Sequence, residues 1–412
     1  MNSPAHPEAD RIVSAALGLV AEGGLDGLTM RDLARAVGKS TTVIVNQFGA
    51  KQGLIEALGE AAFEADALYH QTFLAAAAKL ALSRDALAAL AGHYLRERAS
   101  ASASFVRVWE ELLLVPNPGP RLAALMRRWE TMRRQTWTQL LAPHRQADAV
   151  GAAVSTYLTL EQFYAGALAG RLDYEMIVAE GLGGLADRLL DREDDDAAAT
   201  ESFIEQLIIP RAPAEGLDPA SMKVRLLDVA ADQILSEGLG ALTNRSVSTA
   251  VGTSTSTIAY HWPDMDRFII DAVWHAVFRE MPEYLDHRHA GASGPPDVAQ
   301  WGDLMVRTLT LGAAPGSGFY VKYAKLIAQI CLKARRDPAF AELAMILRGP
   351  EGGGTYVGRA EHWPPQFDLS RRGATRFALW IKGAALLSAA GGHRVEDKDV
   401  VAAAALLTAE HR

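Results

Sequence analysis

The sequence lacks the features that define several classes of protein. It holds a single cysteine in 412 residues, so Cys331 cannot form an intrachain disulfide and has no cysteine partner for a structural metal site. No window of about 18 apolar residues is free of a charge or a proline, so no membrane-spanning helix is predicted. The first residues, MNSPAHPEADR, have neither the basic nor the apolar region of a secretion signal. We therefore expect a cytoplasmic protein without a metal or other cofactor.

Positively charged residues are fewer than negatively charged ones. The chain has 41 Lys and Arg, 49 Asp and Glu, and a formal net charge of −8. This balance argues against a general polyanion binder, although a local cationic patch remains compatible with it. Neither a G-x-S-x-G nor an H-E-x-x-H motif is present, and the glycine-rich segment 349–367 lacks the Lys-Ser/Thr of a phosphate-binding loop. We therefore do not expect an enzyme. The segment 349–367 is interpreted as a surface loop or a mobile lid.

Strand signals are nearly absent, and alanine- and leucine-rich segments at helical spacing dominate, so the predicted class is all-α. A chain of this length exceeds the usual size of one hydrophobic core, which predicts at least two domains. In the first half, beyond the first 50 residues, helices are expected at 51–79, 84–99, 103–115, 119–142, 148–170, 174–191 and 200–209. In the second half they are expected at 265–288, 297–311, 318–335, 338–347, 370–390 and 396–410.

One short pattern occurs twice, 214 positions apart. The stretch 31–48 reads RDLARAVGKSTTVIVNQF, and 245–262 reads RSVSTAVGTSTSTIAYHW. Each copy predicts three short helices. Thr29 is placed to cap the second helix together with Asp32, Gly38 permits a tight turn, and Ser40 can cap the third helix. The equivalent positions are Thr243, Ser246, which lacks the acid, Gly252 and Ser254. A helix, a glycine turn and a helix form the layout of a helix-turn-helix head that reads DNA.

At these residues the sequence resembles the tetracycline-repressor (TetR) family of bacterial transcription regulators, twice over. The first head carries the motif as Leu28-Thr29-Met30-Arg31-Asp32-Leu33-Ala34, Gly38, Ser40, Phe48 and Lys51. The second head carries it as Leu242-Thr243-Asn244-Arg245-Ser246-Val247, Gly252, Ser254 and Trp262. Val45 and Gln47 stand where the family usually has tyrosines, and Met265 replaces the lysine.

Most members of this family are homodimers with two identical heads, so the resemblance implies a dimer written as one chain, a tandem repeat of head and helical ligand-binding body. The expected domains are a first head at 1–58, a first regulatory body at 59–199, a helix and linker at 200–220, a second head at 221–272 and a second body at 273–412. By resemblance, 148–170 and 174–191 would pack on 370–390 and 396–410 in an intrachain four-helix bundle. Two independent domains that each pair with another chain are the alternative, and whether two chains associate further stays open.

The resemblance implies that the heads bind a double-stranded DNA operator. The expected DNA-binding residues are Thr29, Arg31, Ser40, Thr41, Thr42, Val45, Asn46, Gln47, Lys51, Thr243, Arg245, Ser254, Thr255, Ser256, Tyr260 and His261. The window 11–58 has a formal charge of +1 and the window 225–272 one of −3, so the first head is expected to hold phosphates more strongly. The serine and threonine hydroxyls of the second head can bond phosphates or bases, but a second head that only holds the first in place is the alternative.

The resemblance also implies a small apolar or aromatic effector that releases a repressor from DNA. Aromatic side chains are candidate linings of its pocket, and each alone is also compatible with a plain core position. They are Phe105, Trp109, Tyr157, Phe163, Trp274, Phe278, Phe319, Tyr320 and Tyr323. A ligand- or protein-binding adaptor whose heads no longer touch DNA is the competing function.

Overall fold

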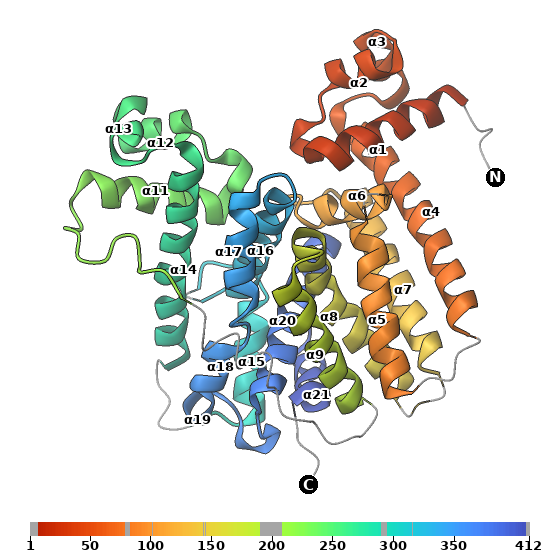
Figure 1. Ribbon diagram of the computed structural model, residues 1–412, viewed down its shortest axis with the longest axis vertical. Coiled ribbons are helices and arrows are strands. Elements are labelled where there is room, and N and C mark those ends of the chain that lie inside the picture. Colours follow the sequence, from red (N-terminus) through yellow and green to blue (C-terminus); the bar gives the residue numbers. More distant parts are fainter. Residues whose placement is uncertain are drawn as a thin grey trace. The chain divides into compact units, whose positions relative to one another are not determined.

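We describe the protein from a computed structural model, which describes residues 7–78, 83–100, 102–142, 144, 146–189, 208–289, 295–314 and 316–408. These residues form helices and no strands, so the predicted all-α class is confirmed (Figure 1). No helix among them combines the length and the apolar character needed to cross a membrane. The helix expected at 200–209 falls outside these ranges apart from its last two residues, which are not helical.

The helices of the first half begin and end close to their expected positions. They are α1 (Pro7–Gly27), α2 (Met30–Val37), α3 (Thr41–Phe48), α4 (Lys51–Ala77), α5 (Arg84–Ala99), α6 (Ser104–Leu113), α7 (Pro120–Leu140), α8 (Ala147–Leu168) and α9 (Leu172–Leu189). Alanine and leucine at helical spacing produce this regularity, because one apolar stripe on each helix must be buried.

The second half contains the same kind of elements. They are α11 (Met222–Glu237), η1 (Leu239–Ala241), α12 (Asn244–Val251), α13 (Thr255–His261), α14 (Met265–His289), α15 (Val298–Thr308), α16 (Phe319–Ala334), α17 (Pro338–Arg348), α18 (Gly353–Val357), α19 (Arg359–His362), η2 (Pro365–Phe367), α20 (Arg371–Gly391) and α21 (Asp397–Thr408). The interpretation of 349–367 as a loop or lid was wrong, because this segment folds into α18, α19 and η2. Trp363 and Phe367 anchor it with buried rings 6.1 Å apart.

Contacts between residues divide the chain into two units, which we describe separately. The first unit is Met1–Leu82, Arg96–Ser155 and Leu387–His393, and the second is Ser83–Leu95, Thr156–Leu386 and Arg394–Arg412.

In the first unit α4 packs against α6 and α7. Asp66 lies at the centre of that packing with no exposed surface. Both terminal nitrogens of Arg98 donate hydrogen bonds to this carboxylate, and Trp129 Nε1 donates another over 2.6 Å.

The second unit contains helices from both halves of the sequence, and α9 packs against α21 within it. Arg376 of α20 donates to the carbonyl oxygen of Gly184 on α9 over 3.1 Å, and Arg188 of α9 donates to that of Ala405 on α21 over 3.1 Å. Helix α20 also comes very close to α8 at Gly383. A Cβ atom on Gly383 would lie 2.1 Å from the carbonyl oxygen of Thr156. The backbones of these helices therefore approach one another only because residue 383 has no side chain.

This close approach gives a testable prediction for the variant Gly383→Ala. The new methyl group would collide with backbone atoms that cannot rotate away, so we expect the unfolding free energy to fall by about 1–3 kcal/mol. Thermal unfolding followed by circular dichroism measures the effect. Gly18→Ala is the matched control, because a Cβ there meets nothing within 4 Å and alanine favours the helix. Equal melting temperatures for Gly383→Ala and the native chain would contradict the close approach.

Candidate functional site

The head of the first unit is built around a left-handed glycine turn. Thr29 caps α2 by accepting a hydrogen bond from the Asp32 backbone over 3.1 Å, as predicted. Gly38 ends α2 with φ 68° and ψ 36°, a conformation that side chains disfavour. The chain then turns directly into α3, whose outer face is exposed while Ile44 is buried.

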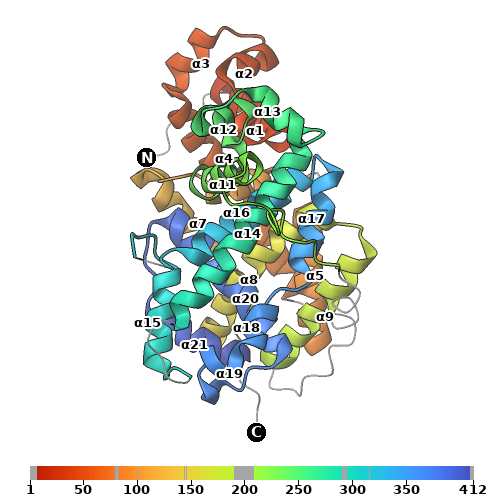
Figure 2. The same ribbon diagram turned by 90° about the vertical axis from the view of Figure 1, so that its left-hand side faces the viewer.

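The head of the second unit consists of α11, α12 and α13 (Figure 2), and the backbone angles of its turn match those of the first head. Gly252 ends α12 with φ 77° and ψ 38°, and Ser254 has the same φ of −86° and ψ of 155° as Ser40. One side-chain contact is repeated as well. Arg225 donates to the carbonyl oxygen of Val251 over 3.2 Å, and Arg11 donates to that of Val37 over 3.1 Å. In each head this arginine ties the first helix to the end of the second.

The structure corrects one expectation about helix caps and adds a contact that was not expected. Ser40 and Ser254 stand at the N-cap positions of α3 and α13, but neither makes a side-chain cap bond. The Ser254 hydroxyl instead lies 2.6 Å from that of Ser256. Ser246, which lacks the acid, completes a capping box with Thr243, since its hydroxyl oxygen accepts a hydrogen bond from the Thr243 backbone N–H over 3.0 Å. A hydroxyl therefore replaces the carboxylate here.

Most of the expected DNA-binding residues lie on the exposed surface of their heads. The exposed ones are Thr29, Arg31, Ser40, Thr41, Thr42, Val45, Asn46, Gln47 and Lys51 in the first head, and Thr243, Arg245, Ser254, Thr255, Ser256 and Tyr260 in the second. His261 is half-buried. Tyr260 is 84% exposed, and its ring contacts that of His261 with centroids 5.0 Å apart.

The cationic side chains of the two heads differ in their availability. Within 11–58, four of the five form contacts inside the protein: Arg11 with Val37, Arg35 with Asp32, Lys39 with Glu8 and Lys51 with the carbonyl oxygen of Leu25. Within 225–272, Arg225 and Arg267 are engaged with Val251 and Asp271. Arg31 and Arg245, 214 positions apart, make no hydrogen bond or ion pair to any residue that the structure describes. Each head thus presents one unengaged guanidinium at the same repeat position.

The acidic start of α14 is partly neutralised. Asp264 accepts a hydrogen bond from the Arg267 backbone over 2.7 Å, and Asp266 forms an ion pair with Lys333 of α16 over 3.0 Å. The Lys333 ammonium compensates part of the charge of Asp266 within the protein, which reduces the repulsion of phosphates expected from the sequence.

A cavity of about 320 Å³ lies among α14, α16, α17 and α20 of the second unit. All five aromatic residues proposed for the second half line it: Trp274, Phe278, Phe319, Tyr320 and Tyr323. Phe319 and Tyr323 stack with ring centroids 5.8 Å apart. The volume and the aromatic lining are typical of sites for small organic ligands.

A buried charge pair, which the sequence analysis missed, forms the polar part of this cavity. Glu351 and Lys382 both line it with less than 5% of their surface exposed, and Lys382 Nζ donates to the Glu351 carboxylate. The hydroxyl of Tyr164 donates to the same carboxylate over 3.0 Å. The only signal in the sequence was a lysine inside the apolar run LWIKGAALL.

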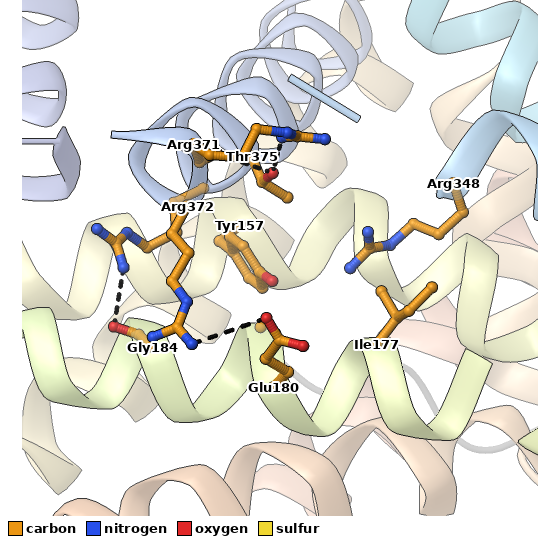
Figure 3. Close-up of a pocket in the computed structure, with 10 residues that line it drawn as sticks. Tyr157, Ile177, Glu180, Gly184, Arg348, Arg371, Arg372 and Thr375 are labelled. Atoms are coloured by element: carbon orange, nitrogen blue, oxygen red, sulfur yellow. Dashed lines mark hydrogen bonds and ion pairs between the residues drawn. The ribbon is translucent and has the colours of Figure 1, made fainter. Parts of the chain in front are cut away.

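The aromatic residues proposed for the first half do not form one site. Phe105 and Trp109 belong to the first unit, whereas Tyr157 and Phe163 belong to the second. Trp109 is fully buried, and the Arg133 guanidinium lies 3.7 Å from the centre of its ring. Trp109 and Phe163 are fully buried in packed cores, Phe105 is half-buried, and Tyr157 lines a small pocket (Figure 3) separate from the aromatic cavity of the second half.

The chain was also compared with known proteins. Residues 12–58 match the family described as "Bacterial regulatory proteins, tetR family". This match covers the first head and supports a family of DNA-binding transcription regulators rather than enzymes. No curated protein matches the chain.

The buried Glu110 beside Trp109 gives a prediction about pH. Burial raises the pKa of Glu110 to about 8, in spite of Arg107 3.5 Å away. Below the ordinary carboxyl pKa both the folded and unfolded forms are protonated. Between that value and about pH 8 only the unfolded form loses the proton, so stability should fall as pH rises, by up to about 1.4 kcal/mol per pH unit.

Glu110→Gln should remove this slope, because the amide does not titrate. Chemical denaturation of both proteins between pH 5 and about pH 8.5 measures it. Glu111→Gln, at the neighbouring half-buried position, is the control and should keep the native slope. Parallel pH profiles for the native chain and Glu110→Gln would contradict the prediction.

Proposed function

We propose that this protein is a sequence-specific transcription regulator, most simply a repressor, that binds DNA through two TetR-like heads in one chain. The observation that carries the proposal is the pair Arg31 and Arg245. Each is exposed and unengaged near the start of a helix that precedes a glycine turn of matching geometry. An unengaged guanidinium can form charge-assisted bonds with a phosphate or bind a guanine edge. Its site of action would be the cytoplasm, where the DNA of a bacterium lies.

We further propose that the two halves form an intrachain pseudo-dimer. Helices α8 and α9 of the first half contact α20 and α21 of the second through Arg376, Arg188 and the close approach at Gly383. Because the partner half is on the same chain, its effective concentration is on the order of millimolar, the value typical of two units joined by a short flexible linker. Pairing within the chain should therefore prevail over pairing between chains. On this proposal, the domain boundaries expected from the sequence describe two such halves.

The cavity is proposed as the site of an apolar or aromatic effector. One face of α14 lines the cavity through Trp274 and Phe278. Two other residues of this helix hold the second head, since His275 contacts Asp228 over 2.7 Å and Arg279 contacts Asp232 over 2.8 Å. A ligand that favours one position of α14 would therefore bias the head attached to it.

Arg31→Ala and Arg245→Ala test the function of the heads. With a DNA fragment from the region upstream of the protein's own gene, each variant should bind about tenfold more weakly if it loses one charged contact. Fluorescence anisotropy at two salt concentrations measures the affinity. Arg359→Gln, an exposed arginine of α19, is the control. Unchanged affinity for Arg245→Ala alone would mean that the second head only supports the first, and no binding by the native chain would favour the adaptor.

Light scattering tests the pseudo-dimer. Free protein and its complex with DNA should each contain one chain, so the free particle should have a mass of 44.3 kDa. The operator should then hold two unlike half-sites, because the two heads expose different side chains. A free particle of twice this mass would show that the halves pair between chains.

A further inference from the structure

The aromatic cavity of the second unit has a polar end that restricts the chemistry of its ligand. Apolar and aromatic side chains of α14, α16, α17 and α20 form most of the wall. Among the described residues that line the cavity, Glu351 and Lys382 alone carry a charge. The two charges are of opposite sign, and Lys382 Nζ donates a hydrogen bond to the Glu351 carboxylate. The net charge of the lining is therefore zero.

A charged ligand would be repelled by one member of this pair. Because the two side chains are hydrogen-bonded to each other, a ligand carboxylate close to Lys382 is also close to Glu351. A ligand ammonium close to Glu351 is close to Lys382 for the same reason. Both residues have less than 5% of their surface exposed, so water and salt screen these repulsions weakly. A third charge brought into this site would lack a counter-ion, which is costly, so the pair favours an uncharged ligand.

The ammonium of Lys382 keeps hydrogen-bonding capacity for such a ligand. An ammonium has three donor protons. With the described residues, Lys382 makes one hydrogen bond, to Glu351, and its Nζ lies 5.2 Å from the centre of the Tyr323 ring. The Glu351 carboxylate, by contrast, has both oxygens engaged, since Oε2 accepts from Lys382 and Oε1 accepts from the Tyr164 hydroxyl over 3.0 Å. The polar end of the cavity therefore has donors to spare and matches an acceptor on the ligand.

The hydroxyl of Tyr323 adds to this donor character. Tyr323 lines the cavity, and burial together with the Glu351 carboxylate raises its pKa, so the hydroxyl keeps its proton. The same ring stacks on Phe319 with centroids 5.8 Å apart, and on α14 the rings of Trp274 and Phe278 also lie 5.8 Å apart. Ring surfaces of this kind bind flat aromatic groups.

We propose that the ligand of this cavity is an uncharged aromatic compound with a carbonyl oxygen, which accepts a hydrogen bond from Lys382 while its rings lie among the aromatic side chains. The proposal rests on the proposed effector site and narrows the chemistry of the effector. Aromatic acids and aromatic amines, which are equally able to fill an aromatic cavity, are excluded by the paired charges.

Four compounds that share two phenyl rings test the proposal. They are benzophenone, which has a carbonyl group, diphenylmethane, which has no polar group, diphenylacetate, an anion, and benzhydrylamine, a cation at neutral pH. Equilibrium dialysis against the full chain without DNA measures their affinities. Benzophenone should bind one site per chain about tenfold more tightly than diphenylmethane, as a hydrogen bond from a charged donor provides. The anion and the cation should each bind at least about tenfold more weakly than benzophenone.

Two variants change the net charge of the site. Glu351→Gln keeps an oxygen that can accept from Tyr164 but leaves Lys382 unpaired, so diphenylacetate should become the tightest ligand of the four. Lys382→Met leaves Glu351 unpaired, so benzhydrylamine should become the tightest, and benzophenone should lose its advantage over diphenylmethane. Thermal unfolding shows whether each variant folds. Glu351→Met/Lys382→Met, which buries no charge, should bind benzophenone and diphenylmethane equally, and Arg359→Gln should keep the native order.

Equal affinities of the native chain for benzophenone and diphenylmethane would overturn the proposal. So would tightest binding of the anion or the cation by the native chain, or no binding of any of the four compounds. Because the dialysis contains no DNA, its result does not depend on the heads. The proposed function fails separately, if the native chain binds no operator or if saturating benzophenone leaves its affinity for DNA unchanged.

Discussion

The buried ion pair of Glu161 and Arg348 is the constraint around which the second unit is arranged. Both side chains are fully buried, both carboxylate oxygens are bonded, and the two residues are 187 positions apart. Tyr174 adds a third bond to the same carboxylate over 3.0 Å. Burial, the largest single cause, favours the uncharged arginine, but Glu161, Tyr157 and Tyr174 together outweigh it and the pKa of Arg348 is raised. Because an unpaired charge in this position costs about 3–5 kcal/mol, α8 and α17 have one relative position that satisfies the pair.

This constraint accounts for polar residues that a hydrophobic pattern would place at the surface. Glu161 lies within α8 and is not exposed. Lys382 in α20 is buried in the same way and is compensated by Glu351. Apolar stripes of alanine and leucine can slide past one another at little cost, whereas buried charges must meet specific partners. The charged pairs thus specify the alignment that the alanine-rich helices leave undetermined.

Local signals made the helices and the turns of the heads predictable from sequence. Gly38 and Gly252 were identified because a tight turn between two helices needs a left-handed residue, and Thr29 because a cap hydroxyl precedes an apolar period. Features that depend on contacts between residues far apart in the sequence could not be predicted. The glycines and prolines of the segment 349–367 predict a loop, whereas the segment forms three short helical elements. These elements are held by tertiary contacts of Trp363 and Phe367, which the local sequence does not indicate. Glu351 drew no attention because its partners, Lys382 and Tyr164, are 31 and 187 positions away.

The candidate pocket residues with aromatic side chains also could not be assigned from the sequence alone. A helix with an aromatic stripe looks alike in sequence whether it lines a cavity or fills a core, and only volume distinguishes the two. In the second half, the small residues Gly352, Gly353 and Ala378 leave space opposite Trp274 and Phe278. Around Trp109, by contrast, the side chains of Arg98 and Arg133 cover the ring. A homodimer must use the same packing in both halves, but a single chain with two different halves is free of that requirement. One half can therefore hold a cavity while the other commits its aromatic residues to stability, and a regulator built this way would need only one effector per pair of heads.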